Sequence, residues 1–265
     1  VRRVLVHPGS GTVFLLARWW AGGELRNTLY RSTDGAASFT KSLGMLTYQG
    51  DVWTPRDTGG PLYALKQDEL QVSVDDGVTW TVAGSTGVTS SGGEISGSEA
   101  GAPRLWIVTN EDGARRLHRS DDAGASFQFV TAISDYWGTL CASSVDPDLF
   151  AYGGVEVHVT RNAGASFGIV NNWWEYYGAE ATMLHADIPG LDVIPDGQGG
   201  ETWYVSTDGG LYESTDGLLS VNNLSLDGLR VSQYYSTHTS SFDENHVVAG
   251  AQDQGYQRAD QPAGD

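Results

Sequence analysis

An eight-residue pattern that returns five times constrains the fold of this chain more than any other feature. It is clearest at Ser73–Trp80, which reads Ser-Val-Asp-Asp-Gly-Val-Thr-Trp, and it recurs at Ser120–Phe127 and Thr160–Phe167. Two looser copies occupy Ser32–Phe39, with the glycine one position early, and Ser214–Val221, without the terminal aromatic residue. A pattern that returns at regular intervals indicates a fold built from repeated structural units.

The residue types in this pattern predict a tight turn. An Asp side chain near the start of a turn accepts hydrogen bonds from backbone N–H groups ahead of it, while Gly takes the positive φ that closes the turn and Ser or Thr adds a local hydroxyl bond. The terminal Trp or Phe is expected to pack beneath the turn. We therefore predict a structural role for the acidic or amide residue of each copy, which is Asp34, Asp75, Asp122, Asn162 or Asp216.

The spacing of these residues predicts an all-β propeller. The successive intervals are 41, 47, 40 and 54 residues, and a four-stranded blade needs about 40–50 residues. The length of 265 residues then fits about six blades in a single domain spanning 1–265. The expected repeats are 1–43, 44–83, 94–131, 139–170, 180–223 and an incomplete 232–258.

The eight-residue pattern resembles the Asp-box, or BNR repeat, of sialidases, xyloglucanase-type glycoside hydrolases and sortilin-like receptors. In those families the box lies on a hairpin at the outer rim of a propeller blade, so the resemblance implies a position away from the central site. The Arg-Ile-Pro motif of sialidases is absent here, which argues against sialidase activity.

The second half of the chain is similar to secreted bacterial BNR proteins related to xyloglucanase-type hydrolases. The similarity covers residues 180–256, although Gln254 stands where that group usually has Asn. It implies a secreted, periplasmic or cell-surface location. The stretches that carry it are His185–Asp187, Ser206–Gly217, Gln233–Tyr235 and Gly250–Gly255.

The sixth repeat stops after Tyr256 without a box or a fourth strand. A propeller must close its ring or leave exposed sheet edges. Either the segment after Val1 supplies the missing strand, or the chain is a fragment of a larger seven-bladed or double propeller. We favour the fragment, which predicts further blades or domains of the same protein as partners.

Composition excludes several classes of function. The formal net charge is −18, from 33 acidic and 15 basic residues, and such a surface repels phosphate backbones, which excludes nucleic acid as the expected partner. No apolar run is long enough for membrane insertion. Neither a Gly-rich phosphate loop nor Cys/His zinc spacing is present, so we expect no cofactor and no metal site, with a structural divalent cation held by acidic residues as the alternative.

The stretch Asn171–Gly178 is the strongest binding candidate, because it places four aromatic residues within five positions. Flat aromatic side chains stack on sugar faces or anchor protein interfaces at low entropic cost. The alternative is that they pack between blades. The candidate ligand-binding residues are Trp173, Trp174, Tyr176 and Tyr177, together with His185 and Asp187.

His185 and Asp187 are expected at the end of an inner strand, on the same face because they are two residues apart. An imidazole beside a carboxylate can orient a sugar hydroxyl, bind a cation or transfer protons; the alternative is a structural hydrogen bond between repeats. Gln252 and Asp253 occupy the corresponding region of repeat six beside glycines, where a turn is expected.

The sequence supports two functions. The first is a non-catalytic extracellular recognition or scaffold propeller that binds a glycan or a protein surface. The second is a glycoside hydrolase, or a degenerate relative, acting on a polysaccharide through two carboxylates about 5–9.5 Å apart. The carboxylates near repeat starts are Asp51, Glu180 and Asp187, and the sequence does not select a pair among them.

Overall fold

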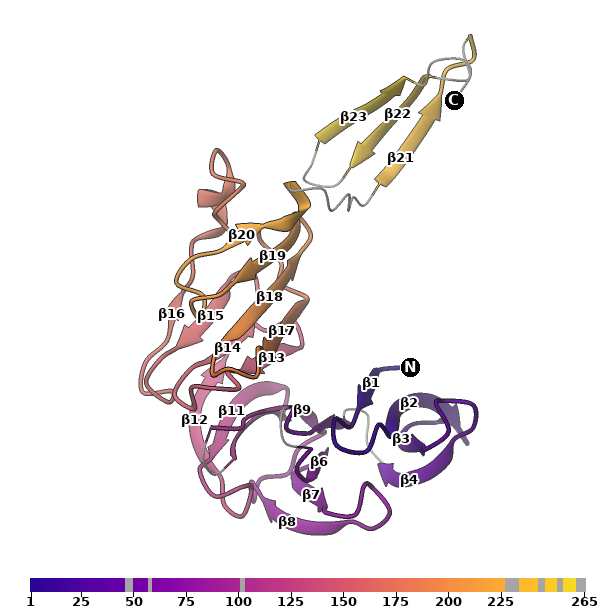
Figure 1. Cartoon of the computed structure of the whole chain (residues 1–265), viewed down its shortest axis with the longest axis vertical. Helices are drawn as coiled ribbons and strands as arrows, with labels where there is room; N and C mark the ends of the chain where they lie inside the picture. Colours follow the sequence, from indigo (N-terminus) through magenta and orange to yellow (C-terminus); the bar gives the residue numbers. More distant parts are fainter. Residues whose placement is uncertain are drawn as a thin grey trace.

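The chain folds into consecutive antiparallel sheets. The computed structural model describes residues 1–45, 50–56, 59–100, 103–226, 234–242, 246–251 and 255–260. Within them are five four-stranded sheets and one three-stranded sheet. Figure 1 shows the five four-stranded sheets in an arc, with the three-stranded sheet extending beyond the fifth. The prediction of an all-β propeller is therefore confirmed for five four-stranded blades, which we number in chain order.

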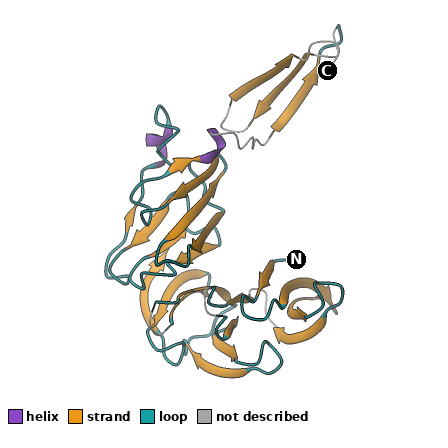
Figure 2. Cartoon of the chain, viewed as in Figure 1, coloured by secondary structure: helices purple, strands orange, loops and turns teal. Residues whose placement is uncertain are grey.

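Each blade is a meander in which consecutive strands pair antiparallel (Figure 2). Blade 1 contains β1 (Arg3–Val6), β2 (Val13–Ala21), β3 (Glu24–Ser32) and β4 (Thr40–Met45). Blade 2 contains β5 (Gly50–Trp53), β6 (Leu62–Lys66), β7 (Glu69–Ser73) and β8 (Thr81–Ser85). Blade 3 contains β9 (Gly93–Ser98), β10 (Arg104–Glu111), β11 (Ala114–Ser120) and β12 (Gln128–Ile133).

The remaining strands continue this order. Blade 4 contains β13 (Thr139–Ala142), β14 (Phe150–Gly153), β15 (Val157–Thr160) and β16 (Gly168–Ile169), followed by the 3-10 helix η1 (Trp173–Tyr176). Blade 5 contains β17 (Gly190–Pro195), β18 (Glu201–Thr207), β19 (Gly210–Ser214) and β20 (Asn222–Asn223), followed by η2 (Leu224–Leu226). The last sheet contains β21 (Tyr234–Thr239), β22 (His246–Ala251) and β23 (Gly255–Asp260). In the part of the chain that is described, neither 3-10 turn has the length or apolar character to cross a bilayer.

The first strand of each blade lies on the inside of the arc. The strands β1, β5, β9, β13 and β17 contact one another in this order. Two of these strands have sequences that do not resemble typical strands, because β9 lies in the Gly- and Ser-rich stretch 84–101 and β17 begins and ends at Gly190 and Pro195. The small residues of β9 reflect crowding rather than a loop, since a Cβ on Gly97 would lie 2.7 Å from the Trp53 ring.

Consecutive blades are joined by four apolar clusters. The cluster between blades 1 and 2 includes Phe14 and Val52, and the one between blades 3 and 4 includes Trp106 and Phe150, whose rings stack at 4.4 Å. An interior blade therefore buries both faces, and a central strand of such a blade is a continuous apolar run. The two remaining interfaces, between blades 2 and 3 and between blades 4 and 5, are of the same kind.

The end blades of the arc are buried on one face only. In β2 the buried residues Phe14 and Leu16 alternate with the half-buried Val13 and Leu15, and in β18 Trp203 and Val205 alternate with less buried neighbours. The alternation follows from the two-residue period of a strand. The outer faces of blades 1 and 5 thus remain partly open.

The repeated turns share one hydrogen-bond pattern. In blade 2 the Asp75 carboxylate accepts hydrogen bonds from the Thr79 hydroxyl at 2.5 Å, the Thr79 N–H at 2.8 Å and the Ser73 hydroxyl at 2.8 Å. These bonds, the one from the Thr79 hydroxyl foremost, lower the pKa of Asp75 to about 2. Equivalent bonds are made by Asp34, Asp122, Asn162 and Asp216.

Both central positions of each turn have positive φ, which explains why the glycine stands at different positions in different copies of the pattern. In blade 1 they are Gly35 (φ 71°) and Ala36 (φ 68°), and in blade 2 they are Asp76 (φ 60°) and Gly77 (φ 76°). Two successive positive φ angles define the turn type that suits a twisted hairpin. Glycine is therefore favoured at either position, and local packing decides which one it occupies.

The last residue of each turn seals the interface with the preceding blade. Trp80, Phe127 and Phe167 pack against the clusters that blades 2, 3 and 4 share with the blade before them, and Val221 does the same in blade 5. In blade 1, the first in the arc, Phe39 is 37% exposed. The aromatic residue expected to pack beneath its own turn therefore also attaches that turn to the preceding blade.

Replacing Gly77 by alanine tests the contact between turn and preceding blade. A Cβ at this position would lie 2.5 Å from the Phe14 ring, whereas one on Gly35, at a similar φ, would have no atom within 4 Å. We expect both Gly77→Ala and Gly35→Ala to lose about 1–2 kcal/mol from the positive φ, and Gly77→Ala to lose about 1–3 kcal/mol more from crowding. Guanidinium unfolding followed by tryptophan fluorescence measures the difference, and equal losses would contradict the packing described.

Candidate functional site

Two arginines of the first strand segment neutralise two buried carboxylates on the inside of the arc. The Arg3 guanidinium contacts both oxygens of Asp51 on β5, at 2.8 and 2.7 Å. Arg2 contacts Glu94 on β9 at 2.7 Å. Both carboxylates are buried. Blade 1 is therefore tied to blades 2 and 3 by paired charges as well as by apolar packing.

The two carboxyl groups have different environments. Burial raises the pKa of Glu94 and the nearby Asp51 raises it further, although Arg2, Arg115 and a hydrogen bond from Tyr136 act in the opposite direction. Asp51 also accepts a hydrogen bond from the Ile95 N–H at 3.1 Å. A carboxyl group whose pKa is raised by burial and by a neighbouring charge is a common feature of acid–base sites.

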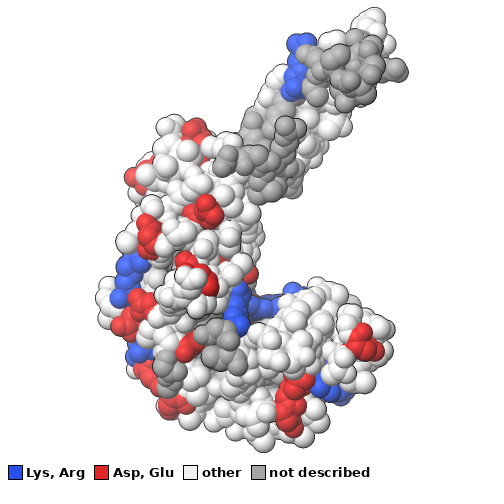
Figure 3. All heavy atoms as spheres, in the orientation of Figure 1, with Lys and Arg blue, Asp and Glu red and all other residues white. Residues whose placement is uncertain are grey.

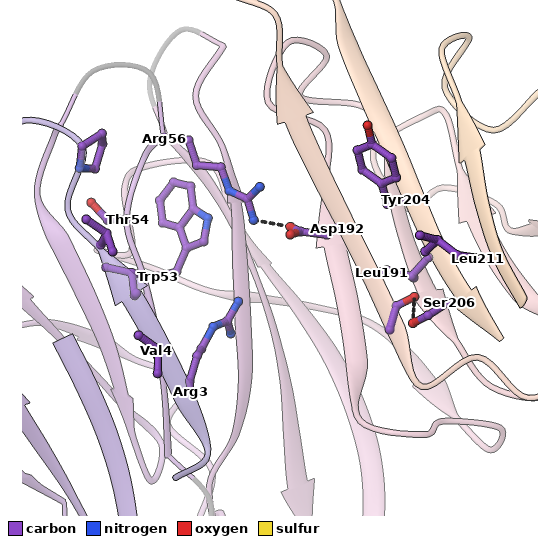
Figure 4. A pocket seen from close by; sticks show the side chains of 14 residues that line it. Arg3, Val4, Trp53, Thr54, Arg56, Leu191, Asp192, Tyr204, Ser206 and Leu211 are labelled. Atoms are coloured by element: carbon purple, nitrogen blue, oxygen red, sulfur yellow. Dashed lines mark hydrogen bonds and ion pairs between the residues drawn. The ribbon is translucent and has the colours of Figure 1, made fainter. Parts of the chain in front are cut away.

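Arg3 separates two cavities. The smaller one, of about 310 Å³, is lined by Arg2, Arg3, Asp51 and Glu94, which we call the charged cluster, together with Thr139 and Leu191. The larger one, of about 550 Å³, lies between the two ends of the arc (Figure 4). Its walls are β1 with Trp53 and Thr54 on one side and β17, β18 and β19 on the other. We call this larger cavity the arc hollow.

Arg56 bridges the arc hollow. Its guanidinium pairs with Asp192 and donates to the Val193 carbonyl, both on β17. Figure 3 shows basic side chains in this concavity, and further basic side chains among the acidic ones on the outer face. The walls carry the half-open faces of blades 1 and 5, with Val4 58% exposed. This arrangement suits an extended or flat ligand better than a small one that needs enclosure.

The aromatic stretch forms a projecting turn. Trp173, Trp174 and Tyr177 are 41%, 55% and 58% exposed, whereas Tyr176 is buried in the core between blades 4 and 5. The Trp173 ring lies perpendicular to the Trp174 and Tyr177 rings, with centroids 5.9 and 6.3 Å away. Three of the four predicted aromatic residues are thus accessible to a ligand, and we call Trp173, Trp174 and Tyr177 the aromatic platform.

The expected alignment of His185 with Asp187 on a strand is wrong. Residues 182–187 form no strand, and Asp187 has φ 62°, which rotates it away from an extended register. His185 is buried, with Nδ1 3.1 Å from Asp208 and its ring 4.6 Å from Tyr176. It therefore supports the base of the aromatic platform.

The three predicted catalytic carboxylates lie in different settings. Asp51 is buried in the charged cluster, Glu180 is exposed and accepts a hydrogen bond from the Gly178 N–H at 2.9 Å, and the Asp187 N–H donates to the Val155 carbonyl at 2.9 Å. Their catalytic roles remain predictions. Gln233 and Gln252–Gln254 lie outside the described residues.

Sequence reasoning missed the arginines. Arg3 and Asp51 are 48 residues apart and Arg56 and Asp192 are 136 apart, so no local pattern joins them. The available signal was their position, since Arg2 and Arg3 stand at the start of the first repeat, next to the apolar run Val4–Val6, in a chain with few basic residues. Inner strands face the centre of a propeller, which places such residues in its middle.

Comparisons with known proteins support the fold. No family model matches the sequence, and no curated protein matches it. The structure is similar to a GH74 xyloglucanase from Xanthomonas campestris, with a TM-score of 0.61 and 16% identity over 100% of this chain. A chain in a nidogen–laminin complex is similar with a TM-score of 0.51 and 9% identity over 80% of this chain.

These similarities concern the β-propeller fold alone. This chain spans 45% of the xyloglucanase chain and 74% of the chain in the nidogen–laminin complex. The same fold thus occurs in a protein named for polysaccharide cleavage and in a protein–protein complex. The resemblance of the turns to the Asp-box remains an interpretation of the sequence.

Replacing Arg3 by methionine tests the charged cluster. Removing the guanidinium leaves the Asp51 carboxylate, whose side chain is 5% exposed, without its cation, which costs up to about 3 kcal/mol. Arg56→Met is the matched control, because Arg56 and Asp192 have side chains 37% and 56% exposed and such pairs contribute about 0–1 kcal/mol. Guanidinium unfolding should show the larger loss for Arg3→Met and partial recovery in Arg3→Met/Asp51→Asn, whereas equal losses would contradict this assignment.

Proposed function

We propose that this protein is a non-catalytic recognition propeller that binds a neutral polysaccharide through the aromatic platform. The observation that carries the proposal is the exposure of Trp173, Trp174 and Tyr177 on a turn that is held in place from below. Exposed rings of this size are costly in water. On a fixed turn they present flat faces on which the apolar C–H face of a sugar ring can stack.

Hydrogen bonds and packing hold the turn that carries the platform. The Asn172 N–H donates to Glu175 at 2.7 Å, and the Asn171 side chain donates to the Leu184 carbonyl at 3.1 Å and accepts from the Leu184 N–H at 3.0 Å. Tyr176 anchors the turn in the core between blades 4 and 5. Binding to a preorganised surface loses less conformational entropy, which favours recognition by these rings.

The charge of the protein favours a neutral ligand. With a formal net charge of −18, the protein repels anionic polymers at long range. Glu175 and Glu180 flank the platform, and carboxylate oxygens accept hydrogen bonds from sugar hydroxyls. The fold that this chain shares with a xyloglucanase supports a β-glucan backbone as the first ligand to test. A secreted or cell-surface location follows from this proposal, because such polymers are extracellular.

A polysaccharide binding assay tests the platform. We expect xyloglucan to bind the full chain and the Trp173→Ala/Trp174→Ala double variant to lose at least tenfold in affinity, because stacking on two rings is removed. Trp20→Ala is the matched control, since Trp20 is 71% exposed on β2 in another blade and its loss should leave binding unchanged. Affinity electrophoresis or calorimetry measures the effect.

The proposal fails if the double variant binds as tightly as the unmodified chain, or if xyloglucan, cello-oligosaccharides and chito-oligosaccharides all fail to bind. In the second case a protein surface takes the place of the glycan. Pull-down with immobilised extracellular-matrix proteins then identifies the protein partner. Its binding should be lost in the same Trp173→Ala/Trp174→Ala variant.

The raised pKa of Glu94 beside Asp51 favours glycoside hydrolysis as a second candidate function. An acid and a carboxylate in one cavity are the groups that this reaction needs. Against it, Glu94 is bound by Arg2 and Tyr136, and Asp51 by Arg3 and the Ile95 N–H, so each carboxyl group already has two donors. The test is the release of reducing ends from xyloglucan by the unmodified chain and by folded Asp51→Asn and Asp187→Asn variants. Release that either substitution abolishes would show that the protein is a hydrolase and not a non-catalytic recognition propeller.

A further inference from the structure

Three side chains with metal-binding atoms converge beside the β14–β15 turn of blade 4. Asp135 precedes β13, Glu156 lies in the turn and His158 lies on β15, and one ligand atom of each is within 4.8 Å of the others. All three are half-buried. We propose that Asp135, Glu156 and His158 bind one divalent transition-metal ion of the Zn²⁺ type.

The Asp135 carboxylate is held against the turn. Its Oδ2 accepts a hydrogen bond from the Val155 N–H at 2.8 Å. A Cβ at position 154 would lie 2.3 Å from this carboxylate, so only glycine leaves room for it. Metal-binding carboxylates are commonly oriented by such a hydrogen bond from the protein.

The His158 imidazole is also oriented before binding. Its ring stacks on Tyr152 with centroids 4.7 Å apart and an interplanar angle of 11°. Its Nε2 makes a long contact of 3.4 Å with Asp135 Oδ2, at the limit of a hydrogen bond. This separation matches two ligands of one ion, because ligand atoms about 2.0–2.2 Å from zinc are about 3.4 Å apart in a tetrahedral arrangement.

Among the described residues, the carboxylates of this cluster have no lysine or arginine partner, and the charged partner of Asp135 is the His158 imidazole. Glu156 makes no side-chain hydrogen bond or ion pair there, and neither Asp135 nor Glu156 is paired with a lysine or arginine. The contrast with the charged cluster is direct, because Asp51 and Glu94 each have their own arginine. Two neighbouring carboxylates without a cation repel each other, and a divalent ion removes that repulsion.

The ligand set selects the class of ion. One imidazole nitrogen with two carboxylate oxygens suits zinc and similar ions, whereas Ca²⁺ takes six to eight oxygen ligands and Mg²⁺ keeps most of its water. Two ligands of one tetrahedral zinc ion lie about 3.3–3.6 Å apart. The three ligand atoms lie within 4.8 Å of one another, so the Glu156 carboxylate needs a movement of up to about 1–1.5 Å to reach the tetrahedral separation. Partial exposure leaves the remaining positions to water.

Calorimetric titration of the tag-free chain with ZnCl₂ tests the site. We expect one ion per chain, with His158→Gln and Glu156→Gln each weakening binding at least tenfold. His238→Gln and Glu213→Gln are the matched controls, because these residues lie on β21 and β19, outside the cluster, and their loss should leave binding unchanged. Ca²⁺ at the same concentrations should bind at least tenfold more weakly than Zn²⁺.

A second measurement on the unmodified chain removes any dependence on the folding of the variants. Zn²⁺ should shift the ring resonances of His158 in a nitrogen–proton correlation spectrum at one equivalent, before those of the other histidines. Binding that persists in both variants, a His158 ring that does not respond, or no heat up to millimolar Zn²⁺ would each overturn the proposal.

Discussion

The packing of each blade against the next is the constraint on which the rest of this structure depends. Four apolar clusters join the five blades, and the final residue of a repeated turn closes the edge of each one. Burial of both faces stabilises an interior sheet that would be marginal by itself. At the ends of the arc one face of each sheet lacks a neighbouring blade, which produces the arc hollow between blades 1 and 5.

The placement of ion pairs also depends on how the blades pack. Where inner strands meet, Arg2 and Arg3 compensate carboxylates on β5 and β9, since a buried carboxylate without a cation would be strongly destabilising. This acidic protein thus has basic residues on the inside of its arc as well as on its outer face (Figure 3). The cluster of Asp135, Glu156 and His158 departs from this rule, and a bound cation would restore it.

The repeated turns could be predicted from sequence because their hydrogen bonds are local. Asp75 and its partners lie within four residues of one another, and their recurrence gave the period of the blades. The inner strands β9 and β17 could not be found in this way, because the small residues of β9 are selected by contact with Trp53 and not by strand propensity. The partner of His185 was also missed, since Asp208 is reached only after the chain returns through β18.

The candidate binding surface was predictable in part. A run of aromatic residues indicated a binding loop, but which rings are exposed depends on Tyr176 being anchored between blades 4 and 5. The ion pairs that surround the arc hollow join residues 48 to 136 positions apart. These residues come together only because the blades are arranged in a curve. The proposed recognition by the aromatic platform therefore depends on the packing that holds Tyr176 in place.

Fluorine NMR of the protein labelled with 5-fluorotryptophan tests recognition by the platform most directly, because each of its nine tryptophans gives its own signal. On addition of xyloglucan, the signals of Trp173 and Trp174 should move, while those of the buried Trp106 and Trp203 stay in place. A response confined to Trp53, on the wall of the arc hollow, or no response at any tryptophan would contradict the account.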